Sequence, residues 1–300
     1  MELSIAIVSY NAREELEACL SSVFKGTEGA APEVIVPEVI VVDNASTDGS
    51  VAMLKDRFPQ VDVSESSENL GFARASNLCW RRASRPLVLF LNSDTVVPKG
   101  ALARMVALMN DRGEIGALGP LLKNADGSIQ MSFGDMLSLS AELRQKILNA
   151  GYGNGRGPLR GYVENLHARE RTVDWVSGAC LLTRRELLER VGGFDEEFFL
   201  YSEDADLCAR IRAQGASILF TPEVEITHHR GRSVEKDRDK AYVESQRSRL
   251  HFYAKHYGQP RLGFLKLYMT TRLGVAYLFH PSARATYRSV LKFVFRGDSV

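Results

Sequence analysis

The sequence predicts an α/β protein with a mostly parallel central sheet flanked by helices, and with a helical extension at its C-terminal end. Three observations support this prediction. Largely apolar runs at 3–9, 38–43 and 86–92 are typical of strands, and residues 88–91 are typical of a strand buried on both faces. Segments with apolar residues at helical spacing, such as 12–24, lie between these runs. Turn and helix-capping residues separate the two kinds of segment, as in a βαβ-type sheet.

The first half of the chain supplies most of the predicted elements. In chain order they are a strand at 3–9, a helix at 12–24, a strand at 38–43, a helix from about 50 to 58, an edge strand at 61–63, a loop that enters a helix at 69–83, a strand at 86–92 and a helix at 100–110. The unit PEVIV occurs twice in residues 32–41. Only one copy can form the core strand that leads into Asp43, and we assign the second. The first copy is then a surface insertion or an edge strand.

The second half of the chain is less regular. Residues 124–172 lose clear periodicity, and 151–161 hold five glycines. A phosphate-binding loop needs a strand before it and a helix after it, so this segment is predicted to be a flexible loop. The remaining predicted elements are a strand that ends near Arg184, a helix that starts there, a helix at 203–215, a strand at 216–222 and a helical tail at 241–295.

The charge of the chain is unevenly distributed. The 300 residues carry a formal net charge of +1 and 45% are hydrophobic, which indicates a globular protein with a real core. From Lys240 onward there are 11 Lys or Arg and two acids, whereas the rest holds 27 basic and 35 acidic residues. A basic, aromatic tail on an acidic body indicates an anionic surface as a partner of the tail.

The cysteines and the chain start bear on the compartment. The four cysteines form no CxxC pair and lie in apolar contexts, which indicates buried thiols in a reducing environment. The chain opens directly into a strand, without the basic start and apolar core of a signal peptide. No uncharged run approaches ~18 residues, and the best candidate span, 261–281, contains Lys266 and Arg272. We therefore expect a cytoplasmic protein.

Polar clusters follow four of the predicted strands. Asp43 and Asp94 each end an apolar run, Glu203 and Asp204 follow FFLYS, and His228 closes the last strand. One such carboxylate is usually a helix cap or a turn residue. Because the carboxyl ends of parallel strands meet at one crevice, four clusters together indicate a ligand site.

The combination of motifs resembles the family 2 glycosyltransferases with a GT-A fold, and in particular rhamnosyltransferase-like members that build bacterial surface polysaccharides. The resemblance covers residues 3 to about 235. The motifs are IVSYN at 7–11, VVDNASTDGS at 41–50, NLGFARASN at 69–77, LNSDT at 91–95, the segment 175–215 and HHRGRS at 228–233. It implies a Rossmann-like GT-A domain at 1–238, with a nucleotide-sugar half at about 1–100 and an acceptor half at about 101–238. The tail at 239–300 receives no function from it.

The resemblance implies a divalent cation, Mg²⁺ or Mn²⁺, that bridges the diphosphate of a nucleotide-sugar. Asp94 is the expected ligand from the family's strand-end motif, in which Asn92 replaces the usual first acid. His228 is the expected second ligand, because it fits a His-x-x-Gly-x-Ser pattern with Gly231 and Ser233. The adjacent His229 stays open as an alternative.

Further roles follow from the same resemblance. Asp43 is expected beside the base, where a carboxylate can accept the N3–H of uracil or thymine. The predicted nucleotide-sugar contacts are Ser9, Tyr10, Asn11, Asp43, Arg74, Asn77, Asn92 and Ser93. For Tyr10, Asn11, Arg74 and Asn77 a turn or cap role stays open.

The Glu-Asp pair of SEDAD is the expected catalytic centre. Asp204 would act as the base that deprotonates the acceptor hydroxyl in an inverting transfer, and Glu203 would orient it or bind the acceptor. Acids that complement a helix N-terminus are the alternative interpretation, and Asp206 is expected to pair with Arg210 at i+4. Trp175 and Phe199 are candidates for stacking on an acceptor sugar or, alternatively, for the core.

The predicted activity is therefore transfer of a sugar, with rhamnose as the best guess, from a dTDP- or UDP-sugar to a glycan or lipid-linked acceptor. The alternatives are an inactive nucleotide-sugar or carbohydrate-binding module and a sugar-phosphate nucleotidylyltransferase. The latter would need a Gly-rich basic loop after the first strand, where the chain has SYNAREE. The tail interleaves basic with apolar residues, which favours the cytoplasmic face of the inner membrane as its partner. A packed subdomain or a homodimer contact stays open, and nucleic acid is disfavoured because no binding motif accompanies the charge.

Overall fold

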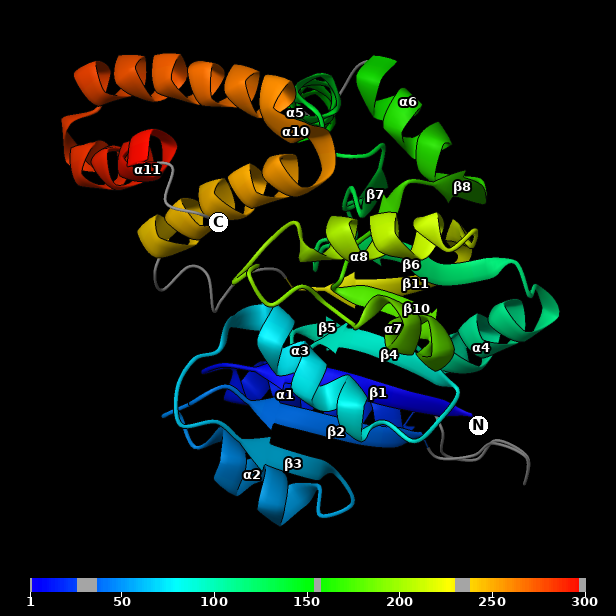
Figure 1. Cartoon of the computed structure of the whole chain (residues 1–300). Helices are drawn as coiled ribbons and strands as arrows, with labels where there is room; N and C mark the ends of the chain where they lie inside the picture. The colour runs from blue at the N-terminus through cyan, green and yellow to red at the C-terminus, as the bar shows by residue number, and fades with distance from the viewer. Residues whose placement is uncertain (1, 26–36, 154–157, 230–237, 297–300) are drawn as a thin grey trace.

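The computed structural model describes residues 2–25, 37–153, 158–229 and 238–296 (Figure 1). Its first half contains β1 (Leu3–Ser9), α1 (Arg13–Lys25), β2 (Glu38–Asp43), α2 (Ser50–Arg57), β3 (Asp62–Glu65), α3 (Gly71–Arg82), β4 (Leu87–Asn92), β5 (Thr95–Val96) and α4 (Ala101–Asp111). Each predicted element of this half is present within a few residues. The second PEVIV copy forms β2, as predicted, and the first copy at 32–36 lies outside the described residues.

The second half is richer in structure than the sequence predicts. It contains β6 (Ile115–Lys123), β7 (Phe133–Gly134), α5 (Leu139–Gly153), α6 (Pro158–His167), β8 (Arg171–Val173), β9 (Trp175–Val176), β10 (Cys180–Arg184), α7 (Arg185–Val191), α8 (Glu203–Ala213), β11 (Ser217–His228), α10 (Arg238–Phe279), a 3₁₀ turn (Pro281–Ala283) and α11 (Arg284–Arg296).

A nine-stranded sheet forms the centre of the molecule, with the order β3-β2-β1-β4-β10-β6-β11-β5 and with β8 paired to β11. Strands β1 to β4, β6 and β11 run in one direction, whereas β5, β8 and β10 run in the opposite direction. The sheet is therefore mostly parallel, as predicted. The carboxyl ends of β1, β4 and β11 lie at the same edge.

Helices cover both faces of this sheet, which explains why the central positions of β2 and β4 are all apolar. Along β2, Val39 and Val41 belong to one core cluster, and Ile40 and Val42 belong to the other. The cluster around Val39 includes residues of α1, α2 and α4, and the opposite cluster includes residues of α3, α7 and α8. Figure 1 shows α3, α7 and α8 in front of the sheet, with α1 behind it.

Several predictions for 115–202 were wrong. Strand β6 was not predicted, although its residues are almost all buried. Helices α5 and α6 occupy most of the region without clear periodicity, and they contribute only Leu148, Val163 and His167 as buried residues. The glycine-rich segment belongs to the end of α5 and the start of α6 on either side of 154–157, which lie outside the described residues. FFLYS is a series of bends, not a strand.

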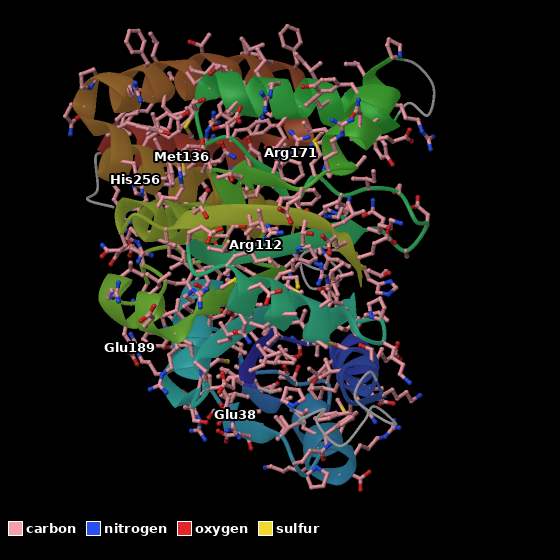
Figure 2. The ribbon with its side chains drawn as sticks, turned by 90° about the vertical axis from the view of Figure 1, so that its right-hand side faces the viewer. Glu38, Arg112, Met136, Arg171, Glu189 and His256 are labelled. Carbon is pink, nitrogen blue, oxygen red and sulfur yellow. The ribbon has the colours of Figure 1, made fainter. Side chains whose placement is uncertain are left out.

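The first part of the helical tail packs on the sheet domain, and the later part extends away from this domain. The helical phi and psi angles of α10 break at Gly258 (φ 69°, ψ −179°), two residues before Pro260. Before the break, Leu250, Phe252 and Tyr253 are buried in the core shared with α8. Beyond it, α10 and α11 form the outermost helices (Figure 1), and His256, labelled in Figure 2, lies between them and the sheet. Among the helices that the structure describes, none is both long and apolar enough to cross a bilayer.

Candidate active site

A cavity of about 880 Å³ lies at the shared edge where β1, β4 and β11 end. The loops after β1 and β4, the end of β11, the loop before α8 and the first turn of α10 all contribute to its wall. It brings together Tyr10, Asn11, Asn92, Ser93, Asp94, Phe199, Glu203, Asp204 and His228 from the predicted set. Strand ends of an α/β sheet are the expected place for such a cavity.

The cavity contains a carboxylate and an imidazole in contact. His228 Nε2 lies 3.2 Å from Asp94 Oδ1 and 3.3 Å from Asn92 Nδ2. The pairing of β5 with β11 holds them there, because Thr95 is opposite His228 and His229 N donates to Asp94 O at 2.9 Å. The His229 side chain is exposed and does not line the cavity. His228, rather than His229, is therefore the imidazole beside Asp94.

Gln130 fixes the orientation of the His228 ring. Its Nε2 donates to Asn124 Oδ1 at 2.7 Å and to His228 O at 2.6 Å, so its Oε1 is the atom 2.9 Å from His228 Nδ1. An amide oxygen can only accept, so Nδ1 donates a proton to Gln130, and Nε2 is the ring nitrogen that faces Asp94. A buried amide that orients a histidine in this way is typical of metal sites. Gln130 was not predicted from the sequence, because it lies within 124–172, the segment without clear periodicity.

The paired ends of β1 and β2 carry two buried polar atoms without a hydrogen-bond partner among the described residues. Ser9 and Asp43 are opposite each other in the β1–β2 register. Asp43 Oδ2 accepts from Ser46 N at 2.9 Å, but the structure describes no partner for Asp43 Oδ1 or Ser9 Oγ. Neither residue lines the cavity itself, whereas the next residue, Asn44, does. An unpaired buried carboxylate oxygen is costly and suits a site that a ligand completes.

Two asparagines organise the loops around this end of the cavity. Asn44 accepts from Leu70 N at 2.8 Å and donates to Asn69 Oδ1 at 2.9 Å. Asn11, with φ of 49°, accepts from Thr47 N at 2.8 Å, so its turn role and its place in the cavity coexist. Asn44 and Asn69 lie within the quoted motifs, but the sequence did not distinguish them as lining residues.

The acidic pair begins α8 after a strained turn. Tyr201 and Ser202 have φ values of 70° and 67°, a conformation that non-glycine residues adopt rarely and often at functional sites. Asp204 Oδ2 accepts from Gly178 N at 3.0 Å, and its Oδ1 accepts from Ala205 N at 2.8 Å. Glu203 is only 6% exposed, and its Oε2 has no hydrogen-bond partner.

Burial shifts the proton affinities of both acids. It raises the pKa of Glu203 well above its usual value, and the charges of Asp204 and Asp206 raise it further. Burial also raises the pKa of Asp204, against the opposing effect of the hydrogen bonds from Gly178 and Ala205. Glu203 therefore favours its neutral form, and Asp204 is the better candidate to accept a proton from a ligand.

The third acid of α8 has a different environment. Asp206 is fully buried, and it pairs with Arg210 at 2.7 Å, as the i+4 spacing predicted. Lys255 Nζ and His256 Nε2 of α10 each lie 2.8 Å from its other oxygen. Burial alone would raise the pKa of Asp206, but the hydrogen bond from His256 and the charge of Arg210 lower it overall. Through its contacts with Lys255 and His256, Asp206 thus connects α10 to α8, the helix that carries Asp204.

Besides Ser9 and Asp43, three predicted contact residues do not line the cavity. Asn77 is fully buried, and its amide bonds Phe194 N and O and Trp80 Nε1, so its side chain faces the packing of α3 and has neither the predicted nucleotide contact nor the alternative turn or cap role. Trp175 is buried against Gly134 and donates to Asp135 O at 3.0 Å, so it does not face an acceptor. Arg74 is exposed outside the cavity, 3.9 Å from Glu196.

Glycine is required where two of the quoted motifs meet. Gly71 has φ of 78°, and a Cβ atom there would lie 2.5 Å from Phe199 O. Phe72 N donates to the same carbonyl at 2.8 Å. The start of α3 is thereby fixed against the loop that leads to Glu203 and Asp204.

The tail also contributes to the cavity, which the sequence did not indicate. Arg238, Lys240, Ala241 and Glu244 of α10 line it. Lys240 Nζ lies 5.5 Å from the centroid of the Phe199 ring. Among the described residues no group of three Asp, Glu, His or Cys side chains suits a metal ion, so a cation here would have to take further ligands from a substrate.

Comparison with known proteins identifies a matching family and similar sequences. Residues 4–192 match the family described as Glycosyl transferase family 2. An N-acetylglucosaminyl-diphospho-decaprenol L-rhamnosyltransferase of Mycobacterium tuberculosis is 30% identical over 298 residues, which cover 95% of this chain and 94% of that protein. The O-antigen biosynthesis protein RfbC of Myxococcus xanthus is 28% identical over 204 residues, covering 67% of this chain and 15% of that protein.

A solved structure resembles the whole chain. The mannosyltransferase PcManGT from Pyrobaculum calidifontis, in complex with GDP-Man and Mn²⁺, has a TM-score of 0.57 and 17% identity, covering 99% of this chain and 88% of that one. At this identity the likeness concerns the fold alone. It confirms the predicted GT-A type α/β architecture.

Proposed function

The chain belongs to glycosyl transferase family 2, and from this premise we propose that it moves a sugar from a nucleoside-diphosphate donor to a hydroxyl of a glycan acceptor with inversion. The observation that carries the proposal is the shared cavity, in which the Asp94–His228 pair and the Glu203–Asp204 pair both lie. The Asp94–His228 pair suits a cation that binds the donor diphosphate. The Glu203–Asp204 pair suits the deprotonation of an acceptor hydroxyl.

Rhamnose is the sugar that we propose, carried by dTDP or UDP. The 30% identical relative, which this chain matches over nearly its full length, is named as a rhamnosyltransferase. The unpaired Oδ1 of Asp43 supports a pyrimidine base, because a carboxylate can accept the N3–H of uracil or thymine. The acceptor that we propose is a lipid-linked glycan, by analogy with the relative's name.

The residues beside Asp94 fit a divalent cation. A carboxylate and an oriented imidazole nitrogen are ligands that Mn²⁺ accepts, and phosphate oxygens of the donor would complete its coordination. A half-turn of the Asn92 amide would present its carbonyl oxygen at the same place. When bound, the cation would offset the charge that develops on the departing diphosphate. Asp94 and His228 would hold it, and Gln130 would keep His228 in the required tautomer.

Asp204 is the proposed base. It would take the proton from the acceptor hydroxyl as that oxygen bonds to the anomeric carbon and the bond from this carbon to the diphosphate breaks. The hydrogen bonds from Gly178 N and Ala205 N fix the carboxylate, so one oxygen lone pair is aimed consistently. Neutral Glu203 would orient the acceptor by donating from its Oε2.

The donor site can be tested without turnover. We expect dTDP or UDP with Mn²⁺ to raise the thermal stability of the wild type selectively over GDP and CMP. Saturation at 100 times the dissociation constant would add about 2.7 kcal/mol. Asp94→Ala should lose this increment, whereas the exposed Asp111→Ala should keep it. Absence of any nucleotide effect on the wild type would contradict the transferase proposal.

We further propose that the outer helices rest on a membrane surface. Large apolar side chains are exposed on α10 beyond Gly258 and on α11, namely Phe264, Leu267, Val275, Leu278, Phe279 and Phe295. Basic residues such as Lys266 and Arg272 lie between them. Apolar side chains interleaved with cations are typical of helices that lie on anionic lipid surfaces.

Vesicle flotation tests this surface. The wild type should float with vesicles that contain anionic lipid and should be released at high salt. Phe264→Ser combined with Phe279→Ser should abolish flotation, whereas Leu78→Ser, which alters an exposed leucine of α3, should not. If the protein formed a concentration-dependent dimer and did not bind vesicles, the result would support self-association through these helices instead.

A further inference from the structure

The cavity has a cationic wall at the start of α10. Arg238 and Lys240, both in the first turn of α10, line it together with Tyr201, Glu203 and Asp204. Lys240 lies over the ring of Phe199, which begins the loop to the acidic pair. Lys240 therefore lies beside the loop that carries the acceptor-side acids Glu203 and Asp204.

A second hollow continues from this wall. It has a volume of about 390 Å³ and is lined by Tyr201, Arg238, Ala241, Tyr242 and Ser245. Tyr201, Arg238 and Ala241 line both hollows, so the two meet at the start of α10. The ring of Tyr242 contacts that of Tyr287 in α11, at 6.4 Å between centroids. A ligand that follows this path would pass from the acidic pair to the outer helices.

One more polar group points to a ligand here. Glu203 Oε2 is buried in the same wall and has no hydrogen-bond partner among the described residues. A buried carboxyl group without a partner is expected to be completed by a bound molecule. Arg and Lys are the side chains that recognise phosphate groups. The wall thus combines Arg238 and Lys240, which can donate hydrogen bonds to a second anion, with Glu203, which can bond an adjacent sugar hydroxyl.

We propose that Arg238 and Lys240 bind the diphosphate of a lipid-linked acceptor, with its sugar at Glu203 and Asp204 and its chain along the hollow beside Tyr242. This inference rests on the proposed function and assigns the acceptor subsite within it. Binding needs no bond to form or break at this wall. It places an anionic acceptor at the cations of α10 and leaves the donor diphosphate to Asp94 and His228.

A matched pair of acceptors tests the assignment. One carries the sugar on a short alkyl diphosphate, and the other carries the same sugar as an uncharged alkyl glycoside. Binding of each is measured by calorimetry in the presence of dTDP and Mn²⁺, so the result does not depend on turnover. Wild type should prefer the diphosphate compound, and Arg238→Gln or Lys240→Gln should weaken its binding about ten-fold or more.

The controls separate this proposal from the donor site. The neutral glycoside should bind each variant as it binds the wild type, Lys240→Arg should restore binding, and Lys99→Gln, which alters an exposed lysine outside the cavity, should have no effect. Equal binding of both acceptors by the wild type, or equal losses for both in the variants, would overturn the subsite. If dTDP or UDP with Mn²⁺ did not raise the thermal stability of the wild type, this result would instead overturn the proposed function.

Discussion

Replacement of Asp204 by asparagine should lower kcat by about 10²- to 10⁴-fold, the range over which a general base contributes. The amide keeps the size of the side chain, and its single oxygen can still accept from one of the two backbone donors, Gly178 N or Ala205 N. The side chain loses its ability to take a proton and one of these two hydrogen bonds. Steady-state transfer measured together with thermal stabilisation by dTDP and Mn²⁺ should show a loss of rate with donor binding retained.

The pH dependence gives this prediction a second readout. A base must be deprotonated to act, so kcat/KM should fall as pH drops through the pKa of Asp204. Because burial raises that pKa from 3.8, the acid limb should lie above the range of an ordinary aspartate. The residual activity of Asp204→Asn should lack this limb.

Glu203→Gln is the matched control for the catalytic assignment. Burial already favours the neutral form of Glu203, so a neutral amide of the same shape should change kcat far less than Asp204→Asn does. A larger loss in Glu203→Gln than in Asp204→Asn would reverse the roles of the two acids. Unchanged turnover in both would favour the binding-module alternative over a transferase that depends on this pair.

Replacement of Asp206 by alanine should destabilise the fold by about 3 kcal/mol, because it removes a fully buried carboxylate and leaves its partly exposed basic partners without it. Asp206 is fully buried and bonds Arg210, Lys255 and His256. Arg210 also donates to Val191 O and Gly193 O, and Lys255 also pairs with Asp195, so the loss should lie near the lower end of the range for buried pairs. Urea unfolding followed by circular dichroism measures this free energy.

The direction of the pKa shift of Asp206 determines how its contribution to the free energy of unfolding changes with pH. The pKa of Asp206 is lowered in the fold, so its contribution is complete above the unfolded value of about 3.9 and is lost as pH falls through the folded value. The difference between wild type and Asp206→Ala should therefore shrink in acid. Glu65→Gln, which breaks the exposed pair with Lys55, should cost at most about 1 kcal/mol. An equal cost for both variants would contradict the argument.

The sequence predicted the first half of the fold well because local patterns there agree with the packing. Strand 38–43 is apolar at its four central positions, since helices cover both faces of the sheet, and each helix carries one apolar face. The strand-end residues Asn92, Asp94 and His228 meet in space because parallel strands end together. Helices α5 and α6 bury few side chains, so they leave only a weak periodic signal.

The misplaced site residues have a different cause. Asn77 and Trp175 lie in motifs that belong to the site, but their polar atoms serve the packing that holds these motifs together. Spacing along the chain does not separate a buried amide that bonds the backbone from one that faces a ligand. Gln130 and Lys240 were missed for the opposite reason, because each enters the cavity from a segment distant in sequence from the motifs it meets.

The assembly of the cavity from distant segments has a consequence for the order of folding. Asn92 contacts His228 across 136 residues, and Gln130 contacts it across 98. Contacts of such long range form after local helices and neighbouring strands, since loop closure precedes the gain from each contact. During synthesis the wall that α10 supplies emerges last. We therefore expect the nascent chain to acquire its sheet first and its capacity to hold both substrates only when synthesis has passed the first turns of α10.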